Sequence, residues 1–106
     1  ATEPHLEAVR RYIQEYYSER LVLDTLAAEF GFSRRSLTRK FRDAFGTSPI
    51  SYQLRLRLEA AQLMLGATNM QIQEIAAEVG FTDVYQFSRA FRKHVGQSPT
   101  EFRRSQ

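Results

Sequence analysis

One stretch of this chain occurs twice, and the repeat constrains the fold more than any other feature. The first copy, residues 26–49, reads LAAEFGFSRRSLTRKFRDAFGTSP, and the second, residues 75–99, reads IAAEVGFTDVYQFSRAFRKHVGQSP. The copies align at a spacing of 49 residues as far as Thr82 and at 50 residues from Phe87 onward, so the second copy has one extra residue after its turn. A match of this length predicts one supersecondary unit used twice.

Each copy is predicted to hold two helices around a tight turn. The first, short helix ends at Gly31 or Gly80, where a left-handed turn needs a residue without a Cβ. Ser33 and Thr82 follow, and each is expected to cap the second helix.

The apolar residues of each copy indicate how its two helices pack. Ala27 and Ala76 lie four residues before the turn glycine, where two helices must cross closely. The second helix of each copy carries a stripe at 3.6-residue spacing that we expect to be core: Leu37, Phe41, Ala44 and Phe45 in the first copy and Phe87, Phe91, His94 and Val95 in the second. This combination predicts a helix-turn-helix in each copy.

Three further helices are expected around the repeats. Residues 4–18 place Leu6, Val9, Ile13 and Tyr16 on one face. Within residues 50–65 the stretch YQLRLRL alternates like a strand, so periodicity alone leaves helix and strand open. The start signal Ser48-Pro49 and the unbroken LEAAQLML favour a helix, with a buried face of Leu54, Leu58, Ala61 and Leu65. Ser98 opens a closing helix through Phe102, because Ser98-Pro99-Thr100-Glu101 is a capping box.

No strand candidate remains, so we predict an all-α fold of about seven helices. Residues 1–106 are expected to form a single domain. It would consist of a first helix-turn-helix subdomain over 4–47, a long linker helix over 48–67 and a second helix-turn-helix subdomain over 68–106.

Composition excludes several classes of protein. The chain has 106 residues and no cysteine, which rules out disulfides, thiolate metal sites and a cysteine nucleophile and suits a cytoplasmic location. No apolar run approaches the ~20 residues of a membrane span. His5 and His94 have neither metal-ligand spacing nor a nucleophile motif beside them, and no glycine-rich phosphate loop occurs. We therefore expect no enzyme, no cofactor and no metal.

Positive charge is concentrated in one predicted helix. Residues 34–45 carry five basic side chains and one acidic side chain, whereas the net charge of the whole chain is +3. Opposite the apolar stripe lie Arg35, Thr38, Arg39 and Arg42, and the matching face of the second copy has Tyr85, Ser88, Arg89 and Arg92, with Gln86 beside them. Arg can donate two bonds to guanine and Gln can pair with adenine in the same way, so these faces suit a major groove.

The repeated segments, the linker residues Arg57-Leu58 and the final IAAEVGFTDVYQFSRAFRKHVGQSPTEFR resemble the DNA-binding domain of AraC/XylS-type transcription regulators of bacteria. The resemblance covers essentially the whole chain. It departs from the family at Lys40, a position more often apolar, and at Gln71, where the family prefers a capping Ser, Thr or Pro.

The resemblance implies a transcription factor whose two recognition helices enter successive major grooves of double-stranded DNA. It places the base-reading positions on six residues: Arg35, Thr38, Arg39, Tyr85, Gln86 and Arg89. The expected phosphate contacts are Arg34, Arg42, Ser88, Arg92 and Lys93. It also implies an effector-binding or dimerisation domain elsewhere in the full-length chain, and RNA polymerase is a further candidate partner.

Three other interpretations fit parts of the sequence. A basic helix face can simply be solvated, although two such faces on two helix-turn-helix units are harder to explain in this way. A protein-interaction module would show apolar rather than basic exposed faces. An RNA reader would need stacking aromatics on an open platform, whereas these aromatics are expected to be buried.

Overall fold

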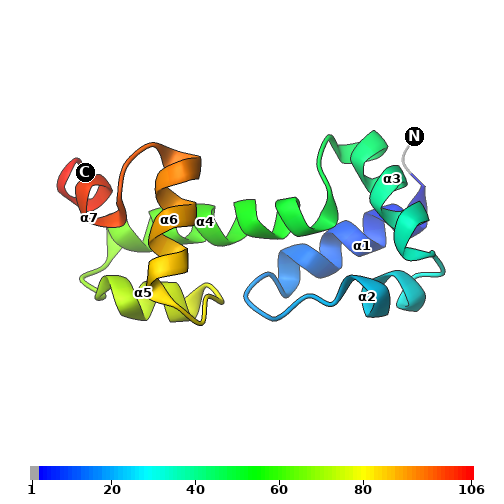
Figure 1. Cartoon of the computed structure of the whole chain (residues 1–106), viewed down its shortest axis with the longest axis horizontal. Helices are drawn as coiled ribbons and strands as arrows, with labels where there is room; N and C mark the ends of the chain where they lie inside the picture. The colour runs from blue at the N-terminus through cyan, green and yellow to red at the C-terminus, as the bar shows by residue number, and fades with distance from the viewer. Residues whose placement is uncertain (1–2) are drawn as a thin grey trace. The chain divides into compact units, whose positions relative to one another are not determined.

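The computed structural model describes residues 3–106, which form seven α-helices and no strand (Figure 1). In chain order these are α1 (Pro4–Glu15), α2 (Leu23–Glu29), α3 (Arg34–Phe45), α4 (Pro49–Ala67), α5 (Ile72–Glu78), α6 (Val84–Val95) and α7 (Pro99–Arg104). The predicted all-α fold is therefore confirmed, and the ambiguous stretch YQLRLRL is helical. Over these described residues, no helix combines the length and the apolar character needed to cross a membrane.

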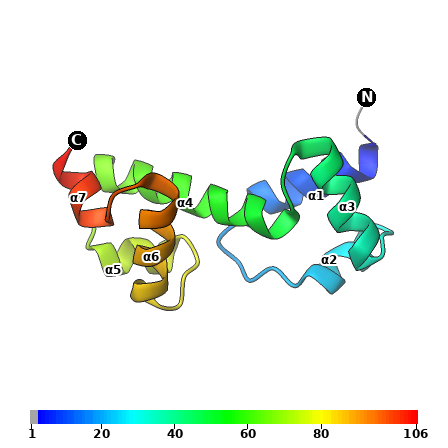
Figure 2. The same ribbon diagram turned by 45° about the horizontal axis from the view of Figure 1, so that its top comes forward.

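The helices form two compact units, one ending at Leu54 and the other beginning at Arg55. This division falls inside α4, so the first turns of α4 belong to the first unit and its remainder to the second. Each unit therefore has an opening helix, a helix-turn-helix pair and a closing helix (Figure 2). The start of α4 closes the first unit, and the rest of α4 opens the second.

The helix-turn-helix pairs of the two units bury four equivalent positions, namely Leu26 and Ile75, Ala27 and Ala76, Leu37 and Phe87, and Phe41 and Phe91. In the first unit the buried hydrophobic side chains include Leu6, Val9, Ile13, Leu26, Ala27, Leu37, Phe41 and Tyr52. In the second they include Leu58, Ala61, Leu65, Ile75, Ala76, Val79, Phe87 and Phe91. Burying residues of this size supplies the hydrophobic stabilisation that holds each helix-turn-helix in place.

The turn inside each helix-turn-helix has the predicted geometry. Gly31 and Gly80 have φ angles of 81° and 107°, in the left-handed region that favours glycine. Beyond each glycine the chain bonds back to the first helix. The N–H of Phe32 donates to the Ala27 carbonyl at 2.8 Å, and that of Phe81 donates to the Ala76 carbonyl at 2.9 Å. Both turns are therefore fixed in the same way.

The closing helices pack onto the second helix of each pair through equivalent aromatic contacts. The ring centroids of Tyr52 and Phe41 are 5.7 Å apart in the first unit, and those of Phe102 and Phe91 are 5.6 Å apart in the second. The repeat therefore extends beyond residues 26–49 and 75–99 into the closing helices.

The residue after each closing aromatic ties down the end of the opening helix. Gln53 Nε2 donates to the carbonyls of Tyr17 and Glu19 at 3.1 and 2.7 Å. Arg103 donates in the same manner around the end of α4, to the carbonyls of Leu65 (3.1 Å), Thr68 (3.2 Å) and Met70 (2.6 Å). These carbonyls lie at or beyond a helix C-terminus, where no further turn supplies donors, so each long polar side chain replaces the missing partners.

Three expected core positions are wrong. Ala44 and His94 are exposed, because the 3.6-residue period identifies a side of a helix but not how far along its length neighbouring helices cover it. Leu54 is 38% exposed. The first turns of α4 are buried through Tyr52 and Gln53 instead, which lie on a different side of the helix from Leu58.

Two further expectations need correction at helix ends. The helix expected over residues 4–18 ends at Glu15. Tyr16 leaves helical geometry with φ −116° and ψ 30°, so it lies outside the buried stripe, and the residue is 41% exposed. Thr82 does not cap the second helix of its copy. The cap is Asp83, whose carboxylate accepts from the N–H of Tyr85 at 2.8 Å, because the one extra residue of this copy moves the helix start along the chain.

Candidate nucleic-acid interface

In the first unit, α3 carries the predicted contact residues. Ser33 caps it as expected, with its Oγ accepting from the N–H of Ser36 at 3.1 Å. Arg34, Arg35, Arg39 and Arg42 are exposed and Thr38 is half-buried. Leu37 and Phe41 hold the opposite face in the core with no exposed surface. The charged face is therefore presented to solvent by a firmly anchored helix.

All five predicted residues of α3 line one open groove on the first unit. The rest of its wall comes from Leu23 of α2, from Asp43, and from Ser48, Pro49 and Ile50 at the start of α4. Arg34 also lies 4.0 Å from the carboxylate of Asp24, with both side chains about 70% exposed. An ion pair this exposed is weak, so it would not hold Arg34 back from a phosphate.

Thr38 is the most constrained of the predicted base-reading residues. Its hydroxyl donates to the backbone carbonyl of Arg34 at 3.0 Å, one turn earlier in the helix. With the proton engaged, Thr38 can offer its oxygen as an acceptor or its methyl group as an apolar contact. Those two roles match a base amino group and the methyl group of thymine, respectively.

The equivalent face of the second unit lies on α6. Tyr85 is 76% exposed. Gln86, Arg89, Arg92 and Lys93 are also exposed, and Ser88 is half-buried. Phe87 and Phe91 anchor the opposite side with no exposed surface, as Leu37 and Phe41 do in the first unit. All the predicted contact residues of the second copy therefore lie on one helix and are accessible.

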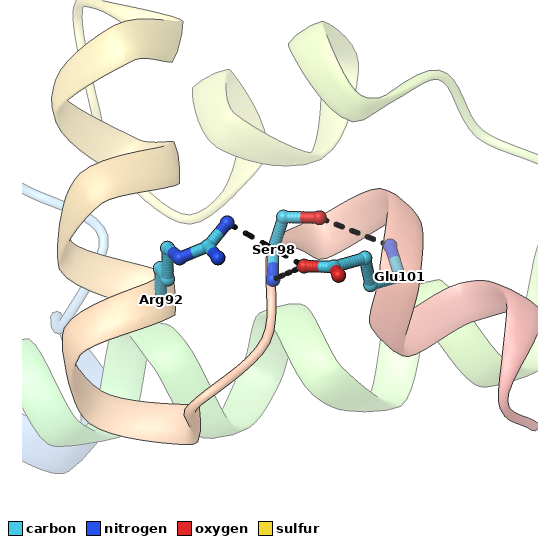
Figure 3. Close-up of polar contacts among 3 residues, drawn as sticks. All are labelled: Arg92, Ser98 and Glu101. Atoms are coloured by element: carbon cyan, nitrogen blue, oxygen red, sulfur yellow. Dashed lines mark hydrogen bonds and ion pairs between the residues drawn. The ribbon is translucent and has the colours of Figure 1, made fainter.

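The predicted phosphate contact Arg92 forms an ion pair with a carboxylate that was not among the predicted interface residues (Figure 3). Its Nη1 lies 3.5 Å from Oε1 of Glu101 in α7. The same Oε1 accepts from the N–H of Ser98 at 2.9 Å, and the N–H of Glu101 donates to Ser98 Oγ at 3.1 Å. The capping box predicted from Ser98 to Glu101 is therefore confirmed, and it fixes an acid beside α6.

This carboxylate is held in its ionised form. The backbone N–H and the side chain of Ser98, together with the nearby guanidinium groups of Arg92 and Arg104, lower the pKa of Glu101 below its ordinary value. The capping box was visible in the sequence, but the contact with Arg92 was not, because it depends on how the chain returns from α6 to α7.

The two departures from the family pattern are accommodated locally. Lys40 is half-buried, with its Nζ 5.5 Å from the ring centroid of Phe32 and 3.8 Å from the carboxylate of Glu3. Gln71 precedes α5, and its N–H donates to the carboxylate of Glu74 at 3.1 Å. The Lys40 side chain therefore has aromatic and acidic partners, and the start of α5 is capped through the side chain of Glu74.

A family model described as a helix-turn-helix domain matches residues 26–105. The Msm operon regulatory protein of Streptococcus mutans is 32% identical over 104 residues, which cover 98% of this chain and 37% of that protein. The C-terminal domain of AraT, a response regulator from Geobacillus stearothermophilus, aligns with a TM-score of 0.93 at 34% identity and covers 98% of this chain and 87% of that one.

A second solved structure is the DNA-binding domain of AdpA, a global transcriptional factor, in complex with a target DNA. It aligns with a TM-score of 0.90 at 29% identity and covers 97% of this chain and 93% of that one. The chain spans about a third of the length of the curated relatives that it matches, between 28% and 37%. The match over residues 26–105 and the shared seven-helix fold establish that this chain belongs to the AraC family of helix-turn-helix transcription regulators.

Proposed function

We propose that this chain binds double-stranded DNA in a sequence-specific manner, with α3 and α6 as its two reading helices, and that this binding serves transcription regulation. The observation that carries the proposal is the equivalence of the two faces. Each is the exposed side of the second helix of a helix-turn-helix, and each is anchored by two fully buried core residues. Membership of a family of transcription regulators, rather than of enzymes, supports the same function.

Within this proposal the contacts divide into two classes. Base edges would be read by Arg35, Thr38, Arg39, Tyr85, Gln86 and Arg89. Phosphates would be bound by Arg34, Arg42, Ser88, Arg92 and Lys93. The exposure of the Arg, Lys, Tyr and Gln side chains supports both assignments. The two reading helices would occupy successive major grooves, as helix-turn-helix pairs do when their half-sites lie one helical turn apart.

The intact regulator would do more than bind DNA. Because the matched relatives are about three times as long as this chain, an effector-binding or dimerisation domain and contact with RNA polymerase are proposals for the full-length protein.

A salt titration tests DNA binding as such. If the two faces neutralise ~6–10 phosphates, the logarithm of the association constant for random-sequence duplex DNA should fall with the logarithm of salt concentration at a slope of roughly −5 to −9. A protein-interaction module would give a slope near zero, and that result would refute the proposal. Replacing Arg42 by alanine should weaken binding to all sequences alike and flatten the slope by about 1.

A further inference from the structure

The ion pair between Arg92 and Glu101 sets the second unit apart from the first. Residues 42 and 92 occupy equivalent places in the repeat, as do residues 51 and 101. Where the second unit has Glu101, the first has Ser51, whose N–H donates to Ser48 Oγ at 3.2 Å. Among residues 3–106, Arg42 makes no ion pair, whereas Arg92 makes one at 3.5 Å. The closing helices of the two units therefore start with the same hydrogen bond to a serine, but the residue that donates it is Glu101 in the second unit and Ser51 in the first.

The carboxylate of Glu101 cannot move away without losing its hydrogen bond from the N–H of Ser98, which caps the start of α7. Its Oε1 accepts both from the N–H of Ser98 and from the guanidinium of Arg92. A phosphate that reached Arg92 would lie within a few ångströms of this fixed negative charge, well inside the ~8–10 Å over which salt screens charges at ordinary ionic strength. The carboxylate would repel that phosphate and compete with it for the same guanidinium.

From this geometry we infer that Glu101 sets the strength of DNA-backbone binding by the second unit, by occupying Arg92 and partly neutralising it. The inference rests on the proposed function. Glu101 acts through Arg92 and does not itself touch DNA. The first unit has no carboxylate at the equivalent position, so Arg42 binds its phosphate without this competition.

The effect of Glu101 on phosphate binding can be measured from the salt slope, which reports the number of counterions that DNA binding releases. Each phosphate neutralised by a free cation contributes about 0.9 to the salt slope. The pair of Arg92 and Glu101 is itself exposed and weak, with side chains 66% and 52% exposed. Unlike Asp24, however, the carboxylate of Glu101 is held in place by the N–H of Ser98. Arg92 therefore contributes less than a free cation, because a fixed carboxylate 3.5 Å from its guanidinium offsets part of its charge. Removing the charge of Glu101 while keeping its capping hydrogen bond should therefore make the slope steeper as well as the binding tighter.

Glu101→Gln is the appropriate change, because glutamine also serves at this position of a capping box. We expect Glu101→Gln to tighten binding to random-sequence duplex DNA about two- to fivefold at ~0.1 M salt, and to steepen the salt slope by up to ~0.9. Glu101→Ser, which copies the first unit, should act in the same direction. Helix content and thermal unfolding, followed by circular dichroism, show whether each variant is folded.

Glu59→Gln is the matched control. Glu59 is an exposed glutamate of the same unit. Among the residues that the structure describes, its carboxylate lies 3.7 Å from Arg55 in α4 and forms no ion pair with Arg92, so its replacement changes the net charge equally without acting on that arginine. It should shift the affinity and the slope less than Glu101→Gln does. In an Arg92→Gln background the effect of Glu101→Gln should be smaller than in the parent chain, because the competing guanidinium is absent.

The outcomes separate this inference from the proposed function. If the unaltered chain binds duplex DNA with a steep salt slope but Glu101→Gln behaves like Glu59→Gln, the role of Glu101 is refuted and DNA binding stands. The role is also refuted if Glu101→Gln steepens the slope equally with and without Arg92. If the unaltered chain shows no salt-dependent binding, the proposed function itself fails.

Discussion

The two units of this molecule share a framework and differ in what they expose. Both turn at a glycine with positive φ, both close through an aromatic pair, and both tie the end of the opening helix with a long polar side chain, Gln53 or Arg103. The exposed faces diverge, with a cluster of arginines on α3 and a mixture that includes tyrosine and glutamine on α6. Packing therefore restricts the buried positions, while the exposed ones are available to read different base pairs.

The two units also differ by one residue inserted in the turn of the second copy, which moves the start of its second helix. The second copy begins its reading helix after Asp83 instead of after the threonine that aligns with Ser33. The core register is unchanged from Phe87 onward, because Phe87 and Phe91 fill the places of Leu37 and Phe41 with no exposed surface. The insertion is thus absorbed in the turn.

Replacing the central phenylalanine of either unit should have the largest effect on the unfolding free energy, and comparing the two losses tests whether the cores are equivalent. Phe41→Ala and Phe91→Ala should each cost about 3–5 kcal/mol of unfolding free energy, because each removes a fully buried ring and leaves a cavity. Urea denaturation measures both. Leu63→Ala, at a side chain that is 74% exposed, is the control and should cost under ~0.5 kcal/mol. A much smaller loss for one phenylalanine would show that the two cores are not equivalent.

A smaller effect should separate the two reading faces. Arg39→Ala and Arg89→Ala should each weaken binding to the preferred DNA site by ~1–3 kcal/mol and relax the preference mainly at one base pair. Because the two arginines belong to different units, the relaxed positions should lie at opposite ends of the site. Competition binding with a set of single-base variants of the site measures this. If both substitutions relaxed the same base pair, the assignment of one reading helix to each unit would be wrong.

The smallest effect concerns the helix caps. Ser33→Ala and Asp83→Ala should each cost about 1 kcal/mol of unfolding free energy, because each removes the acceptor for an N–H in the first turn of a reading helix. Thr82→Ala should cost less than ~0.5 kcal/mol, since Thr82 is exposed and does not cap α6. Thermal unfolding of the three variants measures these losses of unfolding free energy. A larger loss for Thr82→Ala than for Asp83→Ala would contradict the displaced cap.

Much of this fold follows from local sequence signals. The glycines, the small alanines and the apolar stripes identify the two helix-turn-helix units because each signal acts within a few residues. The dual role of α4 was not predicted, because it depends on which unit each turn of the helix contacts. For the same reason, Leu54 matched the helical period but is not buried.

The candidate interface was predictable to a similar extent. Helical periodicity was sufficient to place Arg35, Arg39, Tyr85 and Arg89 on exposed faces, and these side chains are exposed. The hydrogen bond of Thr38 to the backbone and the pairing of Arg92 with Glu101 were not predicted from the sequence. Both are contacts whose geometry a residue pattern does not encode.

Selection of bound duplexes from a random-sequence library tests most directly whether one chain carries two different reading helices. We expect an asymmetric site with two unlike boxes whose centres lie about 10 base pairs apart, one turn of the double helix. Scrambling either box should reduce the affinity. A palindromic site, or a single box that retains full affinity alone, would show that α3 and α6 do not read two different halves of one site.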